Sequence, residues 1–273
     1  MRKDAVLDAT ITQVFTREEI AEAAVADINT KLQEFLTYDE YAWQYETKQA
    51  ITYPKRAEGI ENVLYMCPVC RCEFRMATEN ADIFCRQCGE KWHMTEYGRL
   101  EHLHSQKTSA NHSGSEPADD KTGKRGASDH MDALSHIPGW YEWERSQVIR
   151  EIEDNHYSLD ISVHIDALPN AVNFIDLKEG VLRHDKNGFA LTYTEYGEKQ
   201  AKTLCFPPLM MTSVHTEYDY RGKGQCITLS TLDNTYFLFP RGDGFNVTKI
   251  QFAAEYLYEA AAAEAGNRKK VRI

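Results

Sequence analysis

Residues 67–88 read CPVCRCEFRMATENADIFCRQC and contain the most specific pattern in the chain. Two C-x2-C pairs, Cys67 with Cys70 and Cys85 with Cys88, are separated by fourteen residues. This spacing is typical of a zinc site in which two tight turns each supply two thiolates to one tetrahedral ion. Because four thiolates leave no open position for water or substrate, we expect one structural Zn²⁺ per chain and no catalytic role for it.

The predicted zinc ribbon covers residues 63–104. The runs expected to form its strands are 73–76, 82–84 and 91–97. The first two flank a turn at Glu79-Asn80, which is typical of a hairpin. Gly89 should let the backbone turn over the metal, and Trp92 should shield the sulfurs. We expect this module to lose its structure when the ion is removed.

The chain has seven cysteines, and three fall outside the metal pattern: Cys72, Cys205 and Cys226. An odd number suits a reducing cytosol better than a disulfide framework, so we expect a cytoplasmic protein, with the inner face of the membrane as a further location. A second metal site could be formed by His93, His102 and His104. Exposed histidines are the simpler interpretation, since no carboxylates share helical or hairpin spacing with them.

The net charge limits the choice of partners. With 31 basic and 42 acidic residues the chain carries −11, which repels nucleic acid phosphates at long range. A nucleic-acid-binding ribbon remains an alternative because five basic residues surround the cysteines: Arg71, Arg75, Arg86, Lys91 and Arg99. No apolar run of eighteen residues encodes a transmembrane helix, and the N-terminus lacks the apolar core of a signal peptide.

Residues 1–62 predict a strand and helices without a core of their own. A short β-like run at 9–15 precedes Thr16-Arg17-Glu18-Glu19, a capping-box pattern that begins helices. Apolar residues then recur every three or four positions as far as Phe35, which predicts one amphipathic helix. A strand and one helix cannot enclose a core, so this segment must pack on another part of the chain or on a missing neighbour.

Residues 105–133 have almost no apolar side chains and are predicted to be a disordered linker and a domain boundary. The second domain then covers 134–273. It begins with an amphipathic helix at 136–155, where Pro138 suits an early helical position. Seven short alternating runs follow between 158 and 240, with the strongest hairpin signal at Asn187-Gly188.

A final helix is predicted at 246–265, with Gly266 as its stop. The expected fold is therefore α+β: a small four-cysteine zinc ribbon plus an antiparallel barrel or sandwich of about seven strands, with the helix plugging one open end. This arrangement is typical of pleckstrin-homology-like and GRAM-like domains. The basic residues 268–272 could contact an anionic lipid surface, although a solvated tail that favours the helix dipole is the simpler interpretation.

Several phrases occur in a familiar order after the ribbon. They are Ile137–Arg145 (IPGWYEWER), Leu168–Ala171 (LPNA), His184–Phe189 (HDKNGF), Leu229–Asp233 (LSTLD) and Thr248–Phe252 (TKIQF). Together with the ribbon they resemble the C-terminal extension of bacterial lysophospholipid acyltransferases (1-acylglycerol-3-phosphate acyltransferase-like proteins). The resemblance implies that residues 9–36 are the closing strand and helix of the acyltransferase domain itself.

The catalytic motif of that family is absent from this sequence. The family uses an H-x4-D pair, and none of the ten histidines here has Asp five residues downstream. Adjacent residues such as His184-Asp185 point to opposite faces of a strand, so no catalytic residue is assigned. We therefore expect a non-catalytic accessory region that docks on an acyltransferase domain or a membrane surface. Acyltransferase activity of the chain itself is the alternative.

Overall fold

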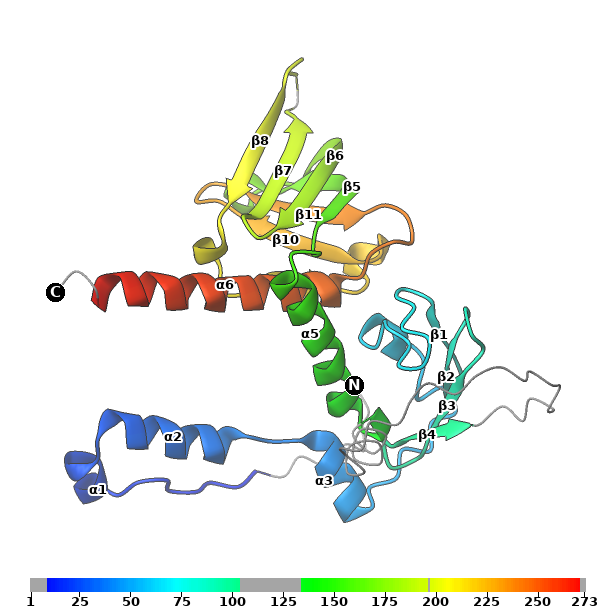
Figure 1. The fold of residues 1–273 in the computed structure, drawn as a ribbon, viewed down its shortest axis with the longest axis vertical. Helices are drawn as coiled ribbons and strands as arrows, with labels where there is room; N and C mark the ends of the chain where they lie inside the picture. The colour runs from blue at the N-terminus through cyan, green and yellow to red at the C-terminus, as the bar shows by residue number, and fades with distance from the viewer. Residues whose placement is uncertain (1–8, 104–133, 196, 271–273) are drawn as a thin grey trace, which may run out of the picture.

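The computed structural model describes residues 9–103, 134–195 and 197–270, with only the backbone for 267–270. The chain is α+β, with one antiparallel sheet of four strands and a second of seven (Figure 1). Among these residues no helix is long and apolar enough to cross a membrane. The predicted linker at 105–133 lies outside the described residues, as does His104.

The N-terminal segment forms three short helices, where the sequence predicted a strand, one amphipathic helix and a short helix opened by the acidic cap at Asp39. The helices are α1 (Arg17–Glu22), α2 (Val25–Leu36) and α3 (Glu40–Thr47). The predicted capping box is confirmed, because Thr16 and Glu19 bond each other's backbone N–H groups. The strand predicted at 9–15 is wrong, since no neighbouring strand pairs with it. The helix breaks because Ala23 and Ala24 adopt extended backbone.

The four-stranded sheet is a meander around the cysteines. Its strands are β1 (Met76–Glu79), β2 (Asp82–Cys85), β3 (Lys91–Met94) and β4 (Leu100–Leu103). The predicted hairpin turn is confirmed, with Asn80 in the left-handed region at φ 56°. The first strand begins later than expected, at Met76, and the third ends earlier, at Met94. A fourth strand follows because the chain turns back at Gly98 and pairs with β3.

Helix α5 (Ile137–Glu153) follows close to the predicted position, with Pro138 in its first turn. The seven-stranded sheet comes next. Its strands are β5 (Leu159–Ala167), β6 (Ile175–Asp185), β7 (Gly188–Thr194), β8 (Ala201–Phe206), β9 (His215–Glu217), β10 (Cys226–Ser230) and β11 (Thr235–Pro240). All seven overlap the runs predicted from alternation. Short 3-10 turns lie at Ile60–Asn62, Pro169–Ala171, Pro208–Met210 and Tyr220–Gly222.

Of the expected barrel or sandwich, the barrel is wrong, because the seven-stranded sheet does not close. The strand order is β8-β7-β6-β5-β11-β10-β9, so β8 and β9 are the two edges and do not pair with each other. Helix α6 (Val247–Lys270) supplies the missing cover, because its Val247, Ile250 and Ala254 share a buried cluster with the strands. The helix also continues through Gly266, which does not stop it. The side chains of the basic tail, residues 268–272, lie outside the described residues.

Three buried clusters hold the two sheets, α5 and α6 together. One belongs to the seven-stranded sheet and α6, and one surrounds the cysteines and includes Ile137 and Trp140 of α5. The third joins Tyr65 and Met66 to Val148 of α5 and Phe252 of α6. Helix α5 therefore contributes to both of the last two clusters, and Figure 1 shows it between the two sheets.

The β6–β7 hairpin is confirmed, but its turn differs from the predicted one. Asp185 pairs with Gly188, so the two turn residues are Lys186 and Asn187. Among these positions positive φ occurs at Gly188, with φ 92°. A Cβ at Gly188 would also lie 2.2 Å from the carbonyl oxygen of Phe206. Glycine is required here for both reasons.

Gly188→Ala should lower the free energy of unfolding by about 3 kcal/mol or more, because backbone strain adds to a clash with backbone. Gly197→Ala is the matched control, since Gly197 also has positive φ but has open space around it. The control should lose about 1 kcal/mol, from strain alone. Urea denaturation of both variants measures the difference, and equal losses would contradict the clash.

Candidate metal centre

The four predicted ligands lie together. The Sγ atoms of Cys67 and Cys88 are 3.7 Å apart, as are those of Cys70 and Cys85, and all four lie within 4.8 Å of one another. Zinc–sulfur bonds of about 2.3 Å in a tetrahedron place the sulfurs about 3.8 Å apart. The cluster can therefore hold one metal ion with four sulfur ligands.

Two similar turns present the sulfurs. The N–H of Arg71 donates to the carbonyl of Cys67, and the N–H of Gly89 donates to the carbonyl of Cys85, each at 2.9 Å. Both donors are left-handed, at φ 59° for Arg71 and 79° for Gly89. Gly89 was expected from the sequence. Arg71 adopts the same conformation at a cost of about 1 kcal/mol, which a bound ion would offset.

Backbone N–H groups point at the sulfurs. Burial raises the pKa of the Cys67 thiol, although N–H groups of Cys70 and Val69 act in the opposite direction. For Cys88, burial is outweighed by hydrogen bonds from the N–H of Glu90 and from the other thiols, and its pKa is lowered. Donors aimed at sulfur stabilise thiolates, the form that binds metal.

The centre lies at the surface of its sheet. Cys67 and Cys85 are buried, whereas Cys70 is exposed. Trp92, which was expected to shield the sulfurs, is buried in the same cluster as Cys67 and Cys85. Cys72 does not belong to the four-sulfur group, as expected, and its thiol contacts the carbonyl of Glu73. Cys205 is exposed and Cys226 is buried, both far along the chain.

The first cysteine turn is attached to α5 by polar contacts. Trp140 Nε1–H donates to the carbonyl of Met66 at 3.1 Å, and Glu144 Oε1 accepts from the N–H of Met66 at 2.7 Å. The side chain of Arg71 donates to Gln147 at 3.1 Å. Glu144 is fully buried, and burial raises its pKa well above the ordinary range. These contacts fix the turn before and after the metal ligands.

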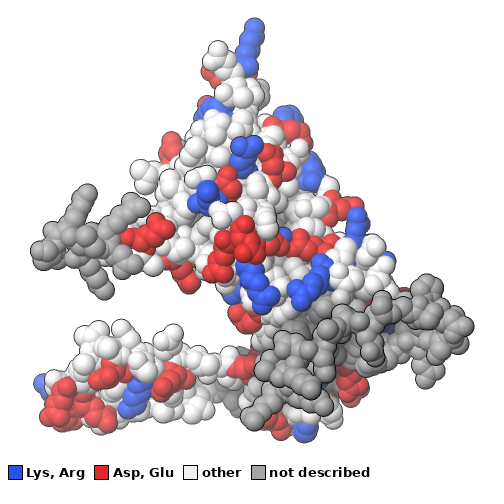
Figure 2. All heavy atoms as spheres, viewed as in Figure 1, with Lys and Arg blue, Asp and Glu red and all other residues white. Residues whose placement is uncertain are grey.

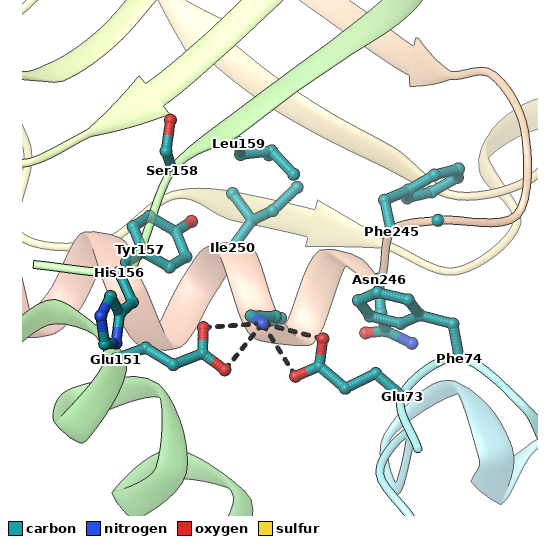
Figure 3. A pocket seen from close by; sticks show the side chains of 12 residues that line it. Glu73, Phe74, Glu151, His156, Tyr157, Ser158, Leu159, Phe245, Asn246 and Ile250 are labelled. Carbon is teal, nitrogen blue, oxygen red and sulfur yellow. Dashed lines mark hydrogen bonds and ion pairs between the residues drawn. The ribbon is translucent and has the colours of Figure 1, made fainter. Parts of the chain in front are cut away.

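The same turn also reaches α6. Lys249 Nζ lies 2.8 Å from Glu73 and 2.8 Å from Glu151 of α5, and the dashed lines in Figure 3 join the three groups. They line a pocket of about 240 Å³ together with Phe74 and Tyr157. Burial raises the pKa of Glu73, while Lys249 acts against that shift. One ammonium thus joins the ribbon, α5 and α6.

The histidines near the ribbon are paired with carboxylates instead of forming a second metal site. His93 Nδ1 lies 2.6 Å from Asp82, its cross-strand neighbour, and His102 Nε2 lies 2.7 Å from Glu90. A carboxylate therefore does share hairpin spacing with His93, and the expectation that none would was wrong for this residue. Neither histidine belongs to a metal-binding group among the described residues.

Sequence reasoning missed a second group that could hold a metal, formed by His164, Asp166 and Asp176. His164 and Asp166 alternate along β5, which was the available signal. The two carboxylates are already neutralised, because Lys223 lies 2.5 Å from Asp166 and Lys178 lies 2.5 Å from Asp176. We therefore interpret this group as a charge network.

Three of the five basic residues around the cysteines have side-chain partners, and Arg75 and Arg86 are exposed. Besides Arg71, Lys91 pairs with Asp82 at 2.5 Å and the Arg99 guanidinium lies over the Tyr45 ring. On the face shown in Figure 2, basic and acidic side chains are interspersed over the seven-stranded unit. A nucleic-acid interface stays a prediction without a specific contact in its favour.

No protein-family model, curated protein or solved structure matches this chain.

Metal analysis of the purified chain should find one ion, lost in Cys67→Ser and Cys85→Ser because each removes one of four ligands. Cys72→Ser is the control and should retain the ion, since Cys72 lies outside the cluster. Elemental analysis and thiol titration with and without chelator measure the result. A folded ribbon that is free of metal would contradict the assignment.

His184 predicts a pH dependence of stability. It is buried, its ring stacks on Phe189 and its Nδ1 lies 2.9 Å from the hydroxyl of Tyr157. Burial lowers its pKa to about 3, despite Asp185. The unfolded chain therefore binds a proton that the folded chain does not, from about pH 6.5 down to about 3. Stability due to this group should fall as the pH drops below about 6.5, with a slope that approaches about 1.4 kcal/mol per pH unit once the unfolded histidine is fully charged.

Urea denaturation at about pH 6.5 and about pH 5.5 measures this slope. His184→Phe is the comparison, because phenylalanine keeps the ring stack but does not titrate. The free energy of unfolding of the variant should depend less steeply on pH. The other titrating groups contribute equally to both slopes, so the difference between the slopes reports His184 alone. Equal slopes would show that His184 titrates normally.

Proposed function

We propose that this chain is a zinc-stabilised, non-catalytic interaction region that docks on an acyltransferase domain of phospholipid synthesis. The observation that carries the proposal is the uncovered apolar face of α1 and α2. Neither helix has a buried residue, and Figure 1 shows both extending away from the sheets. Phe35 is 51% exposed and Leu36 is 73% exposed.

The apolar face requires a neighbour. In α2, Val25, Ile28, Leu32 and Phe35 recur at helical spacing. An isolated twelve-residue helix is marginal in water, so its stability has to come from packing of that face. The resemblance to acyltransferase extensions supplies the partner, because it places residues 9–36 at the edge of the catalytic domain. Docking would restore that contact.

Zinc is the proposed ion because four thiolates in a tetrahedron suit Zn²⁺ or iron. The closed ligand set supports a structural role, since no coordination position remains for a substrate. A colourless protein with one equivalent of zinc agrees with the proposal, whereas visible absorption from an iron–thiolate centre contradicts it.

The seven-stranded unit is proposed to be a pleckstrin-homology-like or GRAM-like domain. Seven antiparallel strands followed by a C-terminal helix support this assignment, with two meanders joined where β5 pairs with β11. The open edge between β8 and β9 makes the sheet less closed than the sequence predicted. The assignment concerns the fold and carries no ligand with it.

Docking is tested by co-purification with a bacterial lysophosphatidate acyltransferase domain. Leu32→Asp with Phe35→Asp should weaken binding at least tenfold, because two charges replace the centre of the apolar face. Thr30→Asp with Gln33→Asp is the matched control on the polar face and should bind normally. Wild-type chain that does not bind, or a control that fails equally, would contradict the proposal. The chain alone should transfer no acyl group from an acyl donor to lysophosphatidate.

A further inference from the structure

Two of the sequence phrases singled out above meet at one end of the seven-stranded sheet. The β5–β6 loop contains Leu168–Ala171 and the β10–β11 turn contains Leu232 and Asp233. The N–H of Leu168 donates to the carbonyl of Thr235 at 2.8 Å, and the N–H of Asn170 donates to that of Asp233 at 2.9 Å. These two backbone hydrogen bonds join the two loops into one unit.

Apolar side chains lie at the apices of this unit. Leu232 is fully exposed and Val172 is 72% exposed, while Phe174 and Ile175 are 38% and 40% exposed. We call these four residues the apolar tip. A single exposed leucine is ordinary, but four exposed apolar side chains on two hydrogen-bonded loops and the first residue of β6 form a group that water disfavours.

The tip is held in position by strained backbone and aromatic packing. Asn170 and Ala171 are both left-handed, at φ 49° and 56°, which is unfavourable for alanine. The Phe174 ring packs 5.3 Å from Phe237, on which Tyr220 also stacks at 4.8 Å. The loop is thus kept in a shape that exposes Val172.

Cations surround the base of the tip. The Arg221 guanidinium lies 4.0 Å from the centre of the Phe174 ring. Lys178, Arg221 and Lys223 all keep at least 40% of their side chains exposed, although Asp176 and Asp166 pair with them. Because the charges nearly cancel, apolar insertion is the main attraction. Lys178, whose partner Asp176 is half-exposed, can exchange that carboxylate for a lipid phosphate at the headgroup level, whereas Lys223 stays paired with the buried Asp166.

We propose that the apolar tip inserts into the interface of a phospholipid bilayer that contains anionic lipid. Exposed apolar side chains with exposed cations beside them match the order of a bilayer interface, in which hydrocarbon lies beneath a layer of phosphate groups. The tip also lies at the end of β5 and the start of β11, opposite the ends next to α5 and α6, where Lys249 holds the ribbon. Membrane contact at the tip would therefore not cover the ribbon. The contact also does not depend on docking of an acyltransferase through α2.

Flotation of the full chain with vesicles of phosphatidylcholine and phosphatidylglycerol at about 7:3 tests the proposal. Wild-type chain should float with the vesicles, and most of it should stay bound in about 0.5 M NaCl because insertion is apolar. Val172→Asp with Leu232→Asp should reduce the bound fraction at least fivefold. Far-UV circular dichroism and melting should not change, since both side chains are exposed.

Two controls separate the tip from other surfaces. Val181→Asp with Leu209→Asp adds the same charge at exposed apolar positions outside the tip and should leave binding intact. A chain that ends at Gly266 lacks the basic tail and should also bind. The proposal is overturned if wild-type chain does not float, if salt abolishes binding, or if the tail truncation alone removes it. Since the vesicles contain no protein, these outcomes are independent of acyltransferase docking.

Discussion

The peptide groups of Met66 connect the metal centre to the rest of the described structure. Trp140 donates to its carbonyl and Glu144 accepts from its N–H, both from within a single turn of α5. The first metal ligand, Cys67, is the next residue. Because Trp140 and Glu144 are fully buried, loss of either contact would leave buried polar groups without partners, which is costly. The cysteine turn is therefore held by α5 on one side, and an ion bound to the four sulfurs would hold it on the other.

This arrangement couples metal binding to the position of the seven-stranded sheet. The cysteine turn ends at Glu73 and Phe74, and Glu73 shares Lys249 with Glu151. Lys249 lies in the first turn of α6, where a cation is unfavourable for the helix dipole, and two carboxylates offset that cost. The adjacent cluster of Met66, Val148 and Phe252 adds apolar packing at the same place. A ribbon without its ion would loosen the polar and apolar contacts together.

The features that were predicted correctly from the sequence are the ones that a local pattern of residues encodes. The seven strands alternate, so each could be located without knowing its partners, and four cysteines within 22 residues identify their own site. Closure of the barrel could not be predicted, because it depends on whether β8 meets β9 across the whole domain. The fourth ribbon strand was missed because Leu100–Leu103 is short and gains its partner only from β3. The break at Ala23-Ala24 has no signal, since alanine is a good helix former.

Contacts between distant residues account for the rest of the candidate site. Strand register places His93 opposite Asp82. The backbone N–H of Met66 donates to the carboxylate of Glu144, which is 78 positions away in the sequence. The two phrases at the apolar tip are far apart in the sequence, and only the pairing of β5 with β11 brings them together. That pairing also separates the tip from the metal centre along the length of the two strands. A surface that contacts lipid at one end and a ribbon held through α5 and α6 at the other would let one rigid sheet set the distance between a membrane and a docked enzyme.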